Sequence, residues 1–445
     1  MYKNNKASYE KRLTVSALSK KLCCGVVACL FIIGASTGFA AGLGKTEQLK
    51  VIELKGAELS SWLGDSIDSY SVGAVVNNRI VPIPFQFDEY NVNGEVYFPE
   101  AKAEIDGEPG LVDPEDRIVF MFTDAGPRKS KRMRADGKIV AEVKLTSFTG
   151  NDYYVYIVKG GRLQSEDVYV RYAAALGRVE TDEYTLVMSK DNALNWESFT
   201  SRKYTGEQES PLDTMKLRLR TGISSPYPKW TFNNKHFIAR PYVEKVGAVR
   251  AITQMEVTFY ILKIPILKFD MQVIHAASSV TYTARVHLKW WQRITLWKPK
   301  LSISLDGNDL KGLVTKSSSN RGLISVVDGR MSEDEKVLRG SRYAEGDKWI
   351  WARSGQNFDL LSSFRFIGRE LPLTFYLEDD ADKKDRPERF QGQSPNTGFQ
   401  IEEIPLTGFF GLTVDLFFSD DFGDGPGDGI HAGLTLRPRI KVTEM

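Results

Sequence analysis

Short segments in which apolar and polar residues alternate run through most of this chain, and they constrain its fold more than any other feature. Side chains on a β-strand point alternately to the two faces of a sheet, so alternation with a period of two predicts strands with one buried face. Gly, Pro, Asn or Asp bound most of these segments, as at turns between strands. The clearest segments are 74–87, 118–122, 139–146, 153–158, 185–188, 216–220, 252–261, 280–288, 301–305, 373–377 and 434–442.

The fold class that these segments predict is all-β. No long amphipathic helix is evident, and only 333–338 has the pattern of one or two helical turns. The chain has 445 residues, which is more than one ordinary domain. We therefore expect an N-terminal β-sandwich at 41–178, followed by a larger two-sheet β-sandwich at 179–445. The alternative is an outer-membrane β-barrel, whose strands also alternate, although the run 261–267 does not.

The first 40 residues have the order of a secretory signal peptide. Six basic residues in 1–22 precede the apolar run 23–36, and Gly38 and Ala40 are small residues at positions −3 and −1 of a cleavage site. The apolar run is short for a membrane span, which needs about 20 residues. We expect cleavage after Ala40, no membrane span in the mature chain, and a periplasmic or secreted location. An uncleaved N-terminal anchor is the alternative.

The composition excludes several classes of protein. The chain has 59 basic and 57 acidic residues, and removal of the signal peptide would leave a slight acidic excess. A basic surplus typical of nucleic-acid binding is therefore absent. All three cysteines lie at 23, 24 and 29, within the expected signal peptide. The mature chain would have no disulfide, no thiolate metal ligand and no cysteine nucleophile.

Catalytic motifs are not found in the sequence. It lacks a GxSxG elbow, a GxxxxGK[ST] loop and an HExxH pair. The four histidines show no spacing typical of metal ligands, and His287 shares a strand face with polar residues. A glycosidase would need a pair of catalytic carboxylates, and the best candidates, although weakly supported, are Asp88, Asp379 and Asp380. Whether the protein is an enzyme stays open, and its catalytic residues are unknown.

The first candidate calcium loop lies at 89–100. Glu89, Asn91, Asn93, Gly94 and Glu100 occupy positions 1, 3, 5, 6 and 12 of such a loop, where oxygen ligands and a glycine are required. The competing interpretation is a plain hairpin, because Asn-Gly between alternating apolar residues is a strong hairpin signal.

The second candidate calcium loop contains four carboxylates within nine residues, Asp420, Asp421, Asp424 and Asp428. Carboxylates this close repel one another unless a cation or solvent offsets their charge. A solvated Asp/Gly turn is the alternative. Structural calcium is therefore the one candidate cofactor.

A segment rich in aromatic and basic residues predicts a ligand-binding surface. Trp290, Trp291, Arg293 and Trp297 are its candidate ligand-binding residues. Flat aromatic rings stack on sugar rings, and cations pair with acidic groups of glycans. The competing interpretation places these tryptophans in the core, as for the pair Trp349 and Trp351.

One short stretch is similar to a known pattern. The residues PFQFD at 84–88, Asn93-Gly94, and DRIVF at 116–120 resemble a P-x-Q-x-D…DG…D-E-L-V-F pattern of secreted bacterial β-proteins of unsettled function. Some of those proteins are linked to polysaccharide use, which is what the resemblance implies here.

The leading hypothesis is an exported protein of the bacterial envelope that binds, and in one version processes, an extracellular polysaccharide or envelope glycan. A non-enzymatic assembly or accessory protein of the periplasm or outer membrane is the second hypothesis, and the β-barrel is the third. The oligomeric state cannot be read from the sequence.

Overall fold

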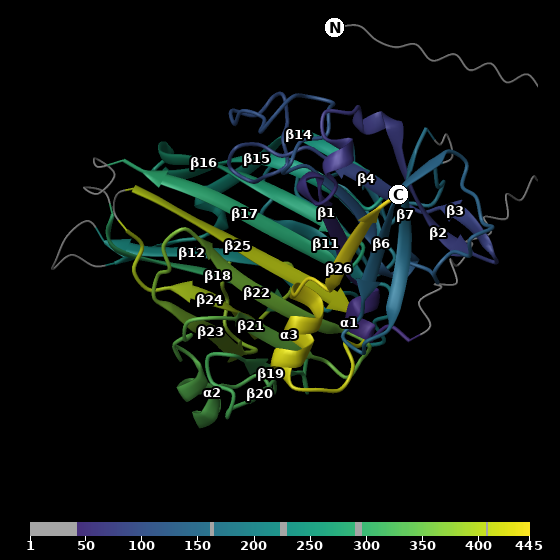
Figure 1. Cartoon of the computed structure of the whole chain (residues 1–445). Coiled ribbons are helices and arrows are strands. Elements are labelled where there is room, and N and C mark those ends of the chain that lie inside the picture. Colours follow the sequence, from purple (N-terminus) through teal and green to yellow (C-terminus); the bar gives the residue numbers. More distant parts are fainter. Residues whose placement is uncertain (1–41, 161–163, 223–228, 290–295, 406–407) are drawn as a thin grey trace, which may run out of the picture. The chain divides into compact units, whose positions relative to one another are not determined.

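The computed structural model describes residues 42–160, 164–222, 229–289, 296–405 and 408–445 (Figure 1). Within these residues the chain forms five antiparallel sheets, so the predicted all-β fold class is confirmed. None of the five sheets closes on itself in this part of the chain. The three α-helices found there are short: α1 (Lys45–Gln48), α2 (Glu333–Leu338) and α3 (Gly427–Thr435). None of them has the length and apolar character needed to cross a membrane.

Two of the sheets are built mainly from the first part of the chain. The smaller has the strand order β1-β5-β4, and the larger has the order β26-β6-β7-β2-β3. Their apolar side chains share one core, in which Leu54, Phe120 and Val155 are fully buried. The bounds are β1 (Val51–Lys55), β2 (Tyr70–Val76), β3 (Arg79–Pro82), β4 (Phe85–Asp88), β5 (Arg117–Met121), β6 (Lys138–Thr146), β7 (Asp152–Lys159) and β26 (Arg439–Glu444).

The segment 74–87, expected as a long strand that Pro82 and Pro84 break, is instead divided among three strands. Asn77 and Asn78 have φ angles of 47° and 61°, so the chain turns back between β2 and β3. Asparagine tolerates this left-handed region better than most residues, and such a pair makes a tight hairpin turn. The prediction overlooked this Asn-Asn turn because it gave weight only to the prolines.

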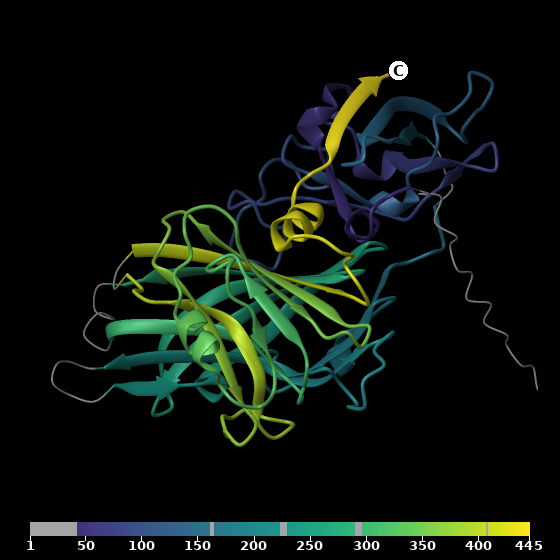
Figure 2. The same ribbon diagram turned by 90° about the horizontal axis from the view of Figure 1, so that it is seen from below.

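The second part of the chain forms the larger sandwich, which Figure 2 shows from below. Its sheets have the orders β14-β15-β16-β17-β25-β22-β21-β19-β20 and β13-β12-β18-β24-β23, and a further sheet has the order β11-β10-β9-β8. Inward residues such as Ala284, Val414 and Phe399 form one large core.

The bounds in this part are β8 (Val170–Ala173), β9 (Arg178–Thr181), β10 (Tyr184–Met188), β11 (Trp196–Ser201), β12 (Leu212–Gly222), β13 (Trp230–Phe232), β14 (Phe237–Val246), β15 (Arg250–Ile261), β16 (Ile264–Ala276), β17 (Ser279–Leu288), β18 (Trp297–Gly307), β19 (Val314–Ser317), β20 (Ser325–Val326), β21 (Lys348–Arg353), β22 (Asp359–Ile367), β23 (Leu373–Asp380), β24 (Gln393–Ile401) and β25 (Gly408–Ser419).

The segment 434–442, expected as a strand, begins inside a helix. Helix α3 extends to Thr435, and β26 starts only at Arg439, after Pro438. Strand β26 pairs with β6, so the end of the chain returns to the sheets built from its first part. Gly427 lets α3 approach the strands, because a Cβ there would lie 2.1 Å from the ring of Trp349.

A buried network of charges joins β1, β4 and β5 to the start of β15. The guanidinium of Arg250 donates from Nε to Asp88 at 2.7 Å, and its other nitrogens reach Glu53 and the hydroxyl of Tyr90. Gln86 accepts from the backbone N–H groups of Val249 and Arg250 at 3.1 and 2.9 Å. The network therefore fixes β4 against the larger sandwich.

Burial alone would raise the pKa of Asp88, but the nearby charges of Arg250 and Lys245 outweigh it and hold this pKa below its usual value. The pKa of Glu53 is lowered in the same way, by Arg250 and Arg117 against the effect of burial. Both carboxylates are therefore ionised partners of Arg250 in the folded chain.

Arg250→Met should lower the free energy of unfolding by about 3–5 kcal/mol, because it leaves buried carboxylates without their partner. Urea unfolding followed by tryptophan fluorescence measures this change. Lys268→Met serves as the control, since Lys268 pairs with Glu256 at an exposed position and its loss should matter far less. Equal unfolding midpoints for wild type and Arg250→Met would contradict the prediction.

The same network predicts acid sensitivity. A carboxylate whose folded pKa lies below its unfolded value, which is about 4, stabilises the fold fully above that unfolded value. The contribution is lost as the pH falls through the lower, folded pKa. We expect the stability of wild type to decline below about pH 4 and the Arg250→Met variant to lose less over the same interval. Unfolding curves recorded across this pH range test the difference.

Candidate functional site

The outer face of the nine-stranded sheet, which points away from the five-stranded sheet, is polar where β17, β25 and β22 lie side by side. The inward residues of β17 and β25, such as Tyr282 and Leu412, belong to the core, so their sequence neighbours point outward. We call these outward residues the polar face; they are Thr281, Thr283, Ser363, Arg365, Thr413 and Asp415.

Asp415 lies at the centre of the polar face and joins three strands. Its carboxylate accepts from Thr281 Oγ1 of β17 at 2.8 Å and from the Arg365 guanidinium of β22 at 2.9 Å. The Asp415 side chain is buried, whereas that of Arg365 is 66% exposed. The buried carboxylate therefore holds an exposed guanidinium whose remaining N–H groups can bind a ligand.

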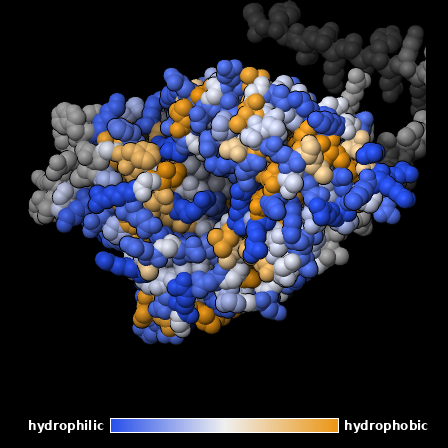
Figure 3. Space-filling model, viewed as in Figure 1, coloured by the Kyte–Doolittle hydropathy of each residue, from blue (hydrophilic) through white to orange (hydrophobic). Residues whose placement is uncertain are grey.

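A loop from the first part of the chain borders the polar face on one side. Arg285 of β17 donates to the Glu95 carboxylate at 2.9 Å and to the carbonyl of Asn93. Gln272 of β16 exchanges two hydrogen bonds with the backbone of Val96. These contacts hold the loop 91–96 along one side of the polar face. Figure 3 shows this side of the molecule, where hydrophilic and hydrophobic residues both border a hollow.

Helix α3 borders the polar face on the other side and forms a pocket with it. His431 of α3 lies 3.0 Å from Ser363 Oγ through Nε2, and its Nδ1 lies 3.7 Å from the Asp347 carboxylate. A cavity of about 400 Å³ is found here, and we call it the His431 pocket. Its lining residues are Gly346, Asp347, Lys348, Ser363, Phe364, Arg365, Asp415, Phe417, His431, Leu434, Thr435 and Leu436.

Burial lowers the pKa of His431, and the negative charges of Asp347 and Asp415 offset part of that effect. The imidazole is therefore neutral at neutral pH, with one nitrogen toward Ser363 and the other toward Asp347. A neutral imidazole can accept a proton or a hydrogen bond from a ligand hydroxyl.

Ser363, His431 and Asp347 follow the order of nucleophile, base and orienting acid, but the surroundings of Ser363 differ from those of a hydrolase serine. Ser363 is 2% exposed, and it pairs with Trp349 of β21 on one side and with Asp415 of β25 on the other. The backbone N–H groups beside Ser363 donate within the β21–β22 and β22–β25 pairings, so they are not free to stabilise an oxyanion. The arrangement therefore favours ligand binding over nucleophilic attack.

The first candidate calcium loop forms a tight turn beside the polar face. Gly94 has a φ of 75° and donates to the carbonyl of Asn91, while Asn91 Oδ1 accepts from the N–H groups of Asn93 and Glu95. Glu89 accepts from Gly110. Glu100 is exposed.

In the second candidate loop every carboxylate has a cationic partner. Asp420 pairs with Lys203, Asp421 with Lys45 and Arg353, Asp424 with Arg353, and Asp428 with Arg321. These pairs offset the repulsion among the four carboxylates. Across the described residues, three or more Asp, Glu, His or Cys side chains are nowhere grouped as for a metal ion. Calcium binding stays a prediction from the sequence.

Of the four candidate ligand-binding residues of the aromatic-basic segment, the structure describes Trp297, which lies in a different sheet from the polar face. Trp290, Trp291 and Arg293 lie outside the described residues. Trp297 is half-buried at the start of β18, in the five-stranded sheet, with the ammonium of Lys298 5.2 Å from its ring centre.

The pair Trp349 and Trp351 is buried in an apolar cluster with Ile430 and Leu434 of α3. Asp88 is buried in the network of Arg250, and Asp379 accepts from the N–H groups of Asp328 and Gly329.

Sequence reasoning missed most of the polar face. It noted only that His287 shares a strand face with polar residues, which include Thr281 and Thr283, and His287 is exposed. The signal that could have extended this face is the polar pair Thr413 and Asp415 within the apolar run 409–418. Nothing local points to His431, because its role depends on where α3 lies.

No protein-family model matches the chain, and no curated protein matches it. Among solved structures, the chain is similar to an alpha-mannosidase from Enterococcus faecalis V583, with 9% identity, a TM-score of 0.47, and 89% of this chain but 44% of that chain covered. The chain is also similar to a protein in glycosyl hydrolase family 38 from Enterococcus faecalis. The identity is 7% and the TM-score is 0.48, and the match covers 89% of this chain and 45% of that chain. A third similar structure is the alpha-N-acetylgalactosaminidase NagBb from Bifidobacterium bifidum. The identity is 9% and the TM-score is 0.35, and the match covers 55% of this chain and 36% of that chain. The chain thus matches less than half the length of each.

The titration of His431 tests the geometry of its pocket. Its pKa should lie below the ordinary value of about 6.5 because of burial. Asp347→Asn should lower it further, because the carboxylate that favours the protonated imidazole is lost. Histidine NMR signals followed against pH measure both shifts. A pKa of His431 that is unchanged in the variant would contradict the arrangement.

Proposed function

We propose that the protein is exported to the bacterial envelope and binds a polysaccharide or envelope glycan on the polar face and in the His431 pocket. The observation that carries this proposal is the set of charged and hydroxyl side chains around Asp415. A sugar ring presents several hydroxyl groups that each donate and accept hydrogen bonds. The polar face offers carboxylate and imidazole acceptors beside guanidinium and hydroxyl donors, at fixed positions on paired strands.

The rigidity of the site supports binding of such a ligand. Asp415 holds Arg365 and Thr281 in place before any ligand arrives, and strands position side chains more firmly than loops do. Phe417 adds an apolar ring to the lining of the pocket, against which the CH groups of a sugar can pack. A pocket of about 400 Å³ has the size of a small-molecule site.

Export is proposed from the sequence of residues 1–40, and it agrees with the absence of cysteine from 41 to 445. The aromatic-basic segment at 290–297 is a second candidate contact for an extended glycan. Its residue Trp297 lies in the five-stranded sheet, whereas the polar face belongs to the nine-stranded sheet.

Arg365→Gln should weaken glycan binding by about tenfold, because a charge-assisted hydrogen bond is worth about 1.5–3 kcal/mol. Binding to a glycan array identifies the ligand, and calorimetry with that glycan measures the loss. Arg365 is largely exposed, so the variant should keep its fold.

Arg339→Gln is the matched control. Arg339 pairs with the buried carboxylate of Glu378 at 2.9 Å, as Arg365 does with Asp415, but on the five-stranded sheet side. The Arg339→Gln variant should bind the glycan with the same affinity as wild type. Failure of the wild-type protein to bind any glycan, or equal weakening by the two substitutions, would overturn the proposal.

A further inference from the structure

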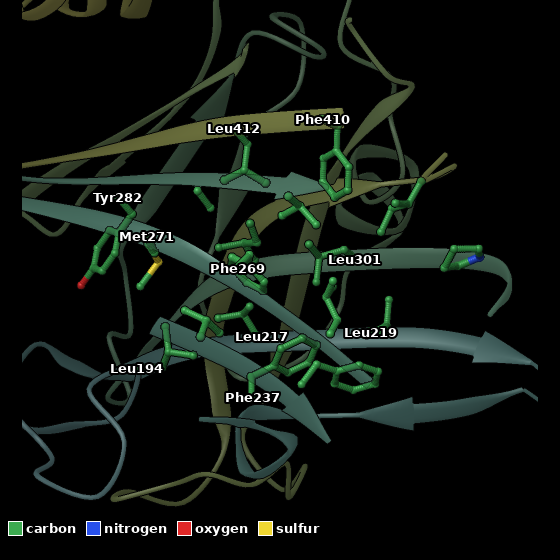
Figure 4. A pocket seen from close by; sticks show the side chains of 18 of the residues that line it. Leu194, Leu217, Leu219, Phe237, Phe269, Met271, Tyr282, Leu301, Phe410 and Leu412 are labelled. Carbon is green, nitrogen blue, oxygen red and sulfur yellow. The ribbon is translucent and has the colours of Figure 1, made fainter. Parts of the chain in front are cut away.

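An apolar cavity lies between the two sheets of the larger sandwich, on the opposite side of β17 and β25 from the polar face. Its volume is about 100 Å³, and its lining includes Leu217, Phe269, Leu301 and Leu412 (Figure 4). Among the described lining residues Tyr282 alone carries a side-chain oxygen or nitrogen. In Figure 4 its hydroxyl points away from the other labelled side chains.

The cavity is unsuited to ordered water molecules. A buried water needs about 10–15 Å³ and two to four polar partners, so the cavity has the room but lacks the partners. Packed sheets lie about 10 Å apart, which makes the space narrow in one direction. A linear hydrocarbon chain fits such a slot better than a bulky ring system does.

The cavity extends toward the hairpin between β15 and β16. Phe259 and Leu267, which pair near the end of this hairpin, both line it. The turn consists of Leu262 and Lys263, with φ angles of 50° and 68°. Leu262 is 89% exposed, and Ile264 beside it is 61% exposed. A bulky apolar residue is strained in this region of φ and gains nothing from exposure to water, so a role in contact with an apolar partner explains it.

Strand β13 brings an exposed tryptophan to the same end of the sandwich. The ring of Phe232 packs against that of Phe259 at a centroid distance of 5.3 Å, which ties β13 to the hairpin. Trp230, two residues earlier on β13, is 47% exposed. Tryptophan is favoured where an apolar phase meets water.

Strand β18 adds positive charge beside the cavity. Leu296 and Pro299 line the cavity, and Trp297 lies between them in sequence. The ammonium groups of Lys229 and Lys298 lie 5.9 and 5.2 Å from the centre of its ring. These cations are suitably placed for an anionic head group whose chain enters between the sheets.

From these observations we propose that the larger sandwich binds an acyl chain with an anionic head group. The chain occupies the apolar cavity, the hairpin turn at Leu262 contacts the apolar part during entry, and Lys229 and Lys298 hold the head group. This site is independent of the proposed glycan site, because it uses the inward residues of β17 and β25 instead of the outward ones.

A dansyl-labelled undecanoate tests the proposal, because its emission rises and shifts to the blue when it leaves water. Wild-type protein should produce this change, and unlabelled laurate should reverse it. Ala284→Phe fills the cavity from β17 and should weaken binding by about tenfold. Thermal melting with laurate is the second measurement, since a ligand of the folded state raises the melting temperature of wild type. The rise should be absent in Ala284→Phe.

Leu262→Asp tests the hairpin and should weaken binding several-fold. Aspartate tolerates a positive φ better than leucine, so this variant should fold. The matched control is Val337→Asp, an exposed apolar residue of α2, which should bind as wild type does.

Vesicles of phosphatidylglycerol, with phosphatidylcholine vesicles for comparison, distinguish a membrane lipid from a free fatty acid as the source. Displacement of the probe by the anionic vesicles identifies a membrane lipid, and displacement by laurate alone identifies a free amphiphile. Absence of probe binding to wild type, or binding that persists unchanged in Ala284→Phe, would overturn the proposal.

Discussion

The buried guanidinium of Arg250 is the interaction on which the arrangement of the remaining elements depends. It lies at the first residue of β15, and its partners Asp88 and Glu53 come from β4 and β1. A buried ion pair needs nearly complete hydrogen bonding to offset its loss of hydration, and Gln86 and Tyr90 complete it here. Since Tyr90 directly precedes the loop 91–96, the same network positions this loop along one side of the polar face.

The fold class could be predicted because it depends on a local property. Alternation with a period of two is visible in any short window, and burial of one strand face produces it. The hairpin at Asn77 and Asn78 and the helix after Pro426 were missed for a different reason. Each depends on a few residues whose preferences are weak, and strand-like patterns on either side concealed them.

The candidate site could not be predicted in the same way, because strand order is not a local property. Thr281, Arg365 and Asp415 are separated by 50 residues or more, and they meet only because β25 inserts between β17 and β22. A sequence shows that each strand has a polar face, but not which polar faces are adjacent. His431 adds a further condition, since it reaches Ser363 only when α3 packs on Trp349 and Trp351.

Strands β17 and β25 carry the polar face on one side and the apolar cavity on the other, so their register determines both. A slip of one residue would turn the carboxylate of Asp415 into the cavity, and burial of an unpaired charge there would cost several kcal/mol. Asp415 opposes such a slip directly, because its bonds to Thr281 and Arg365 form only in the observed register with both neighbouring strands. The polar contacts that are offered to a ligand therefore also specify the register of the sheet.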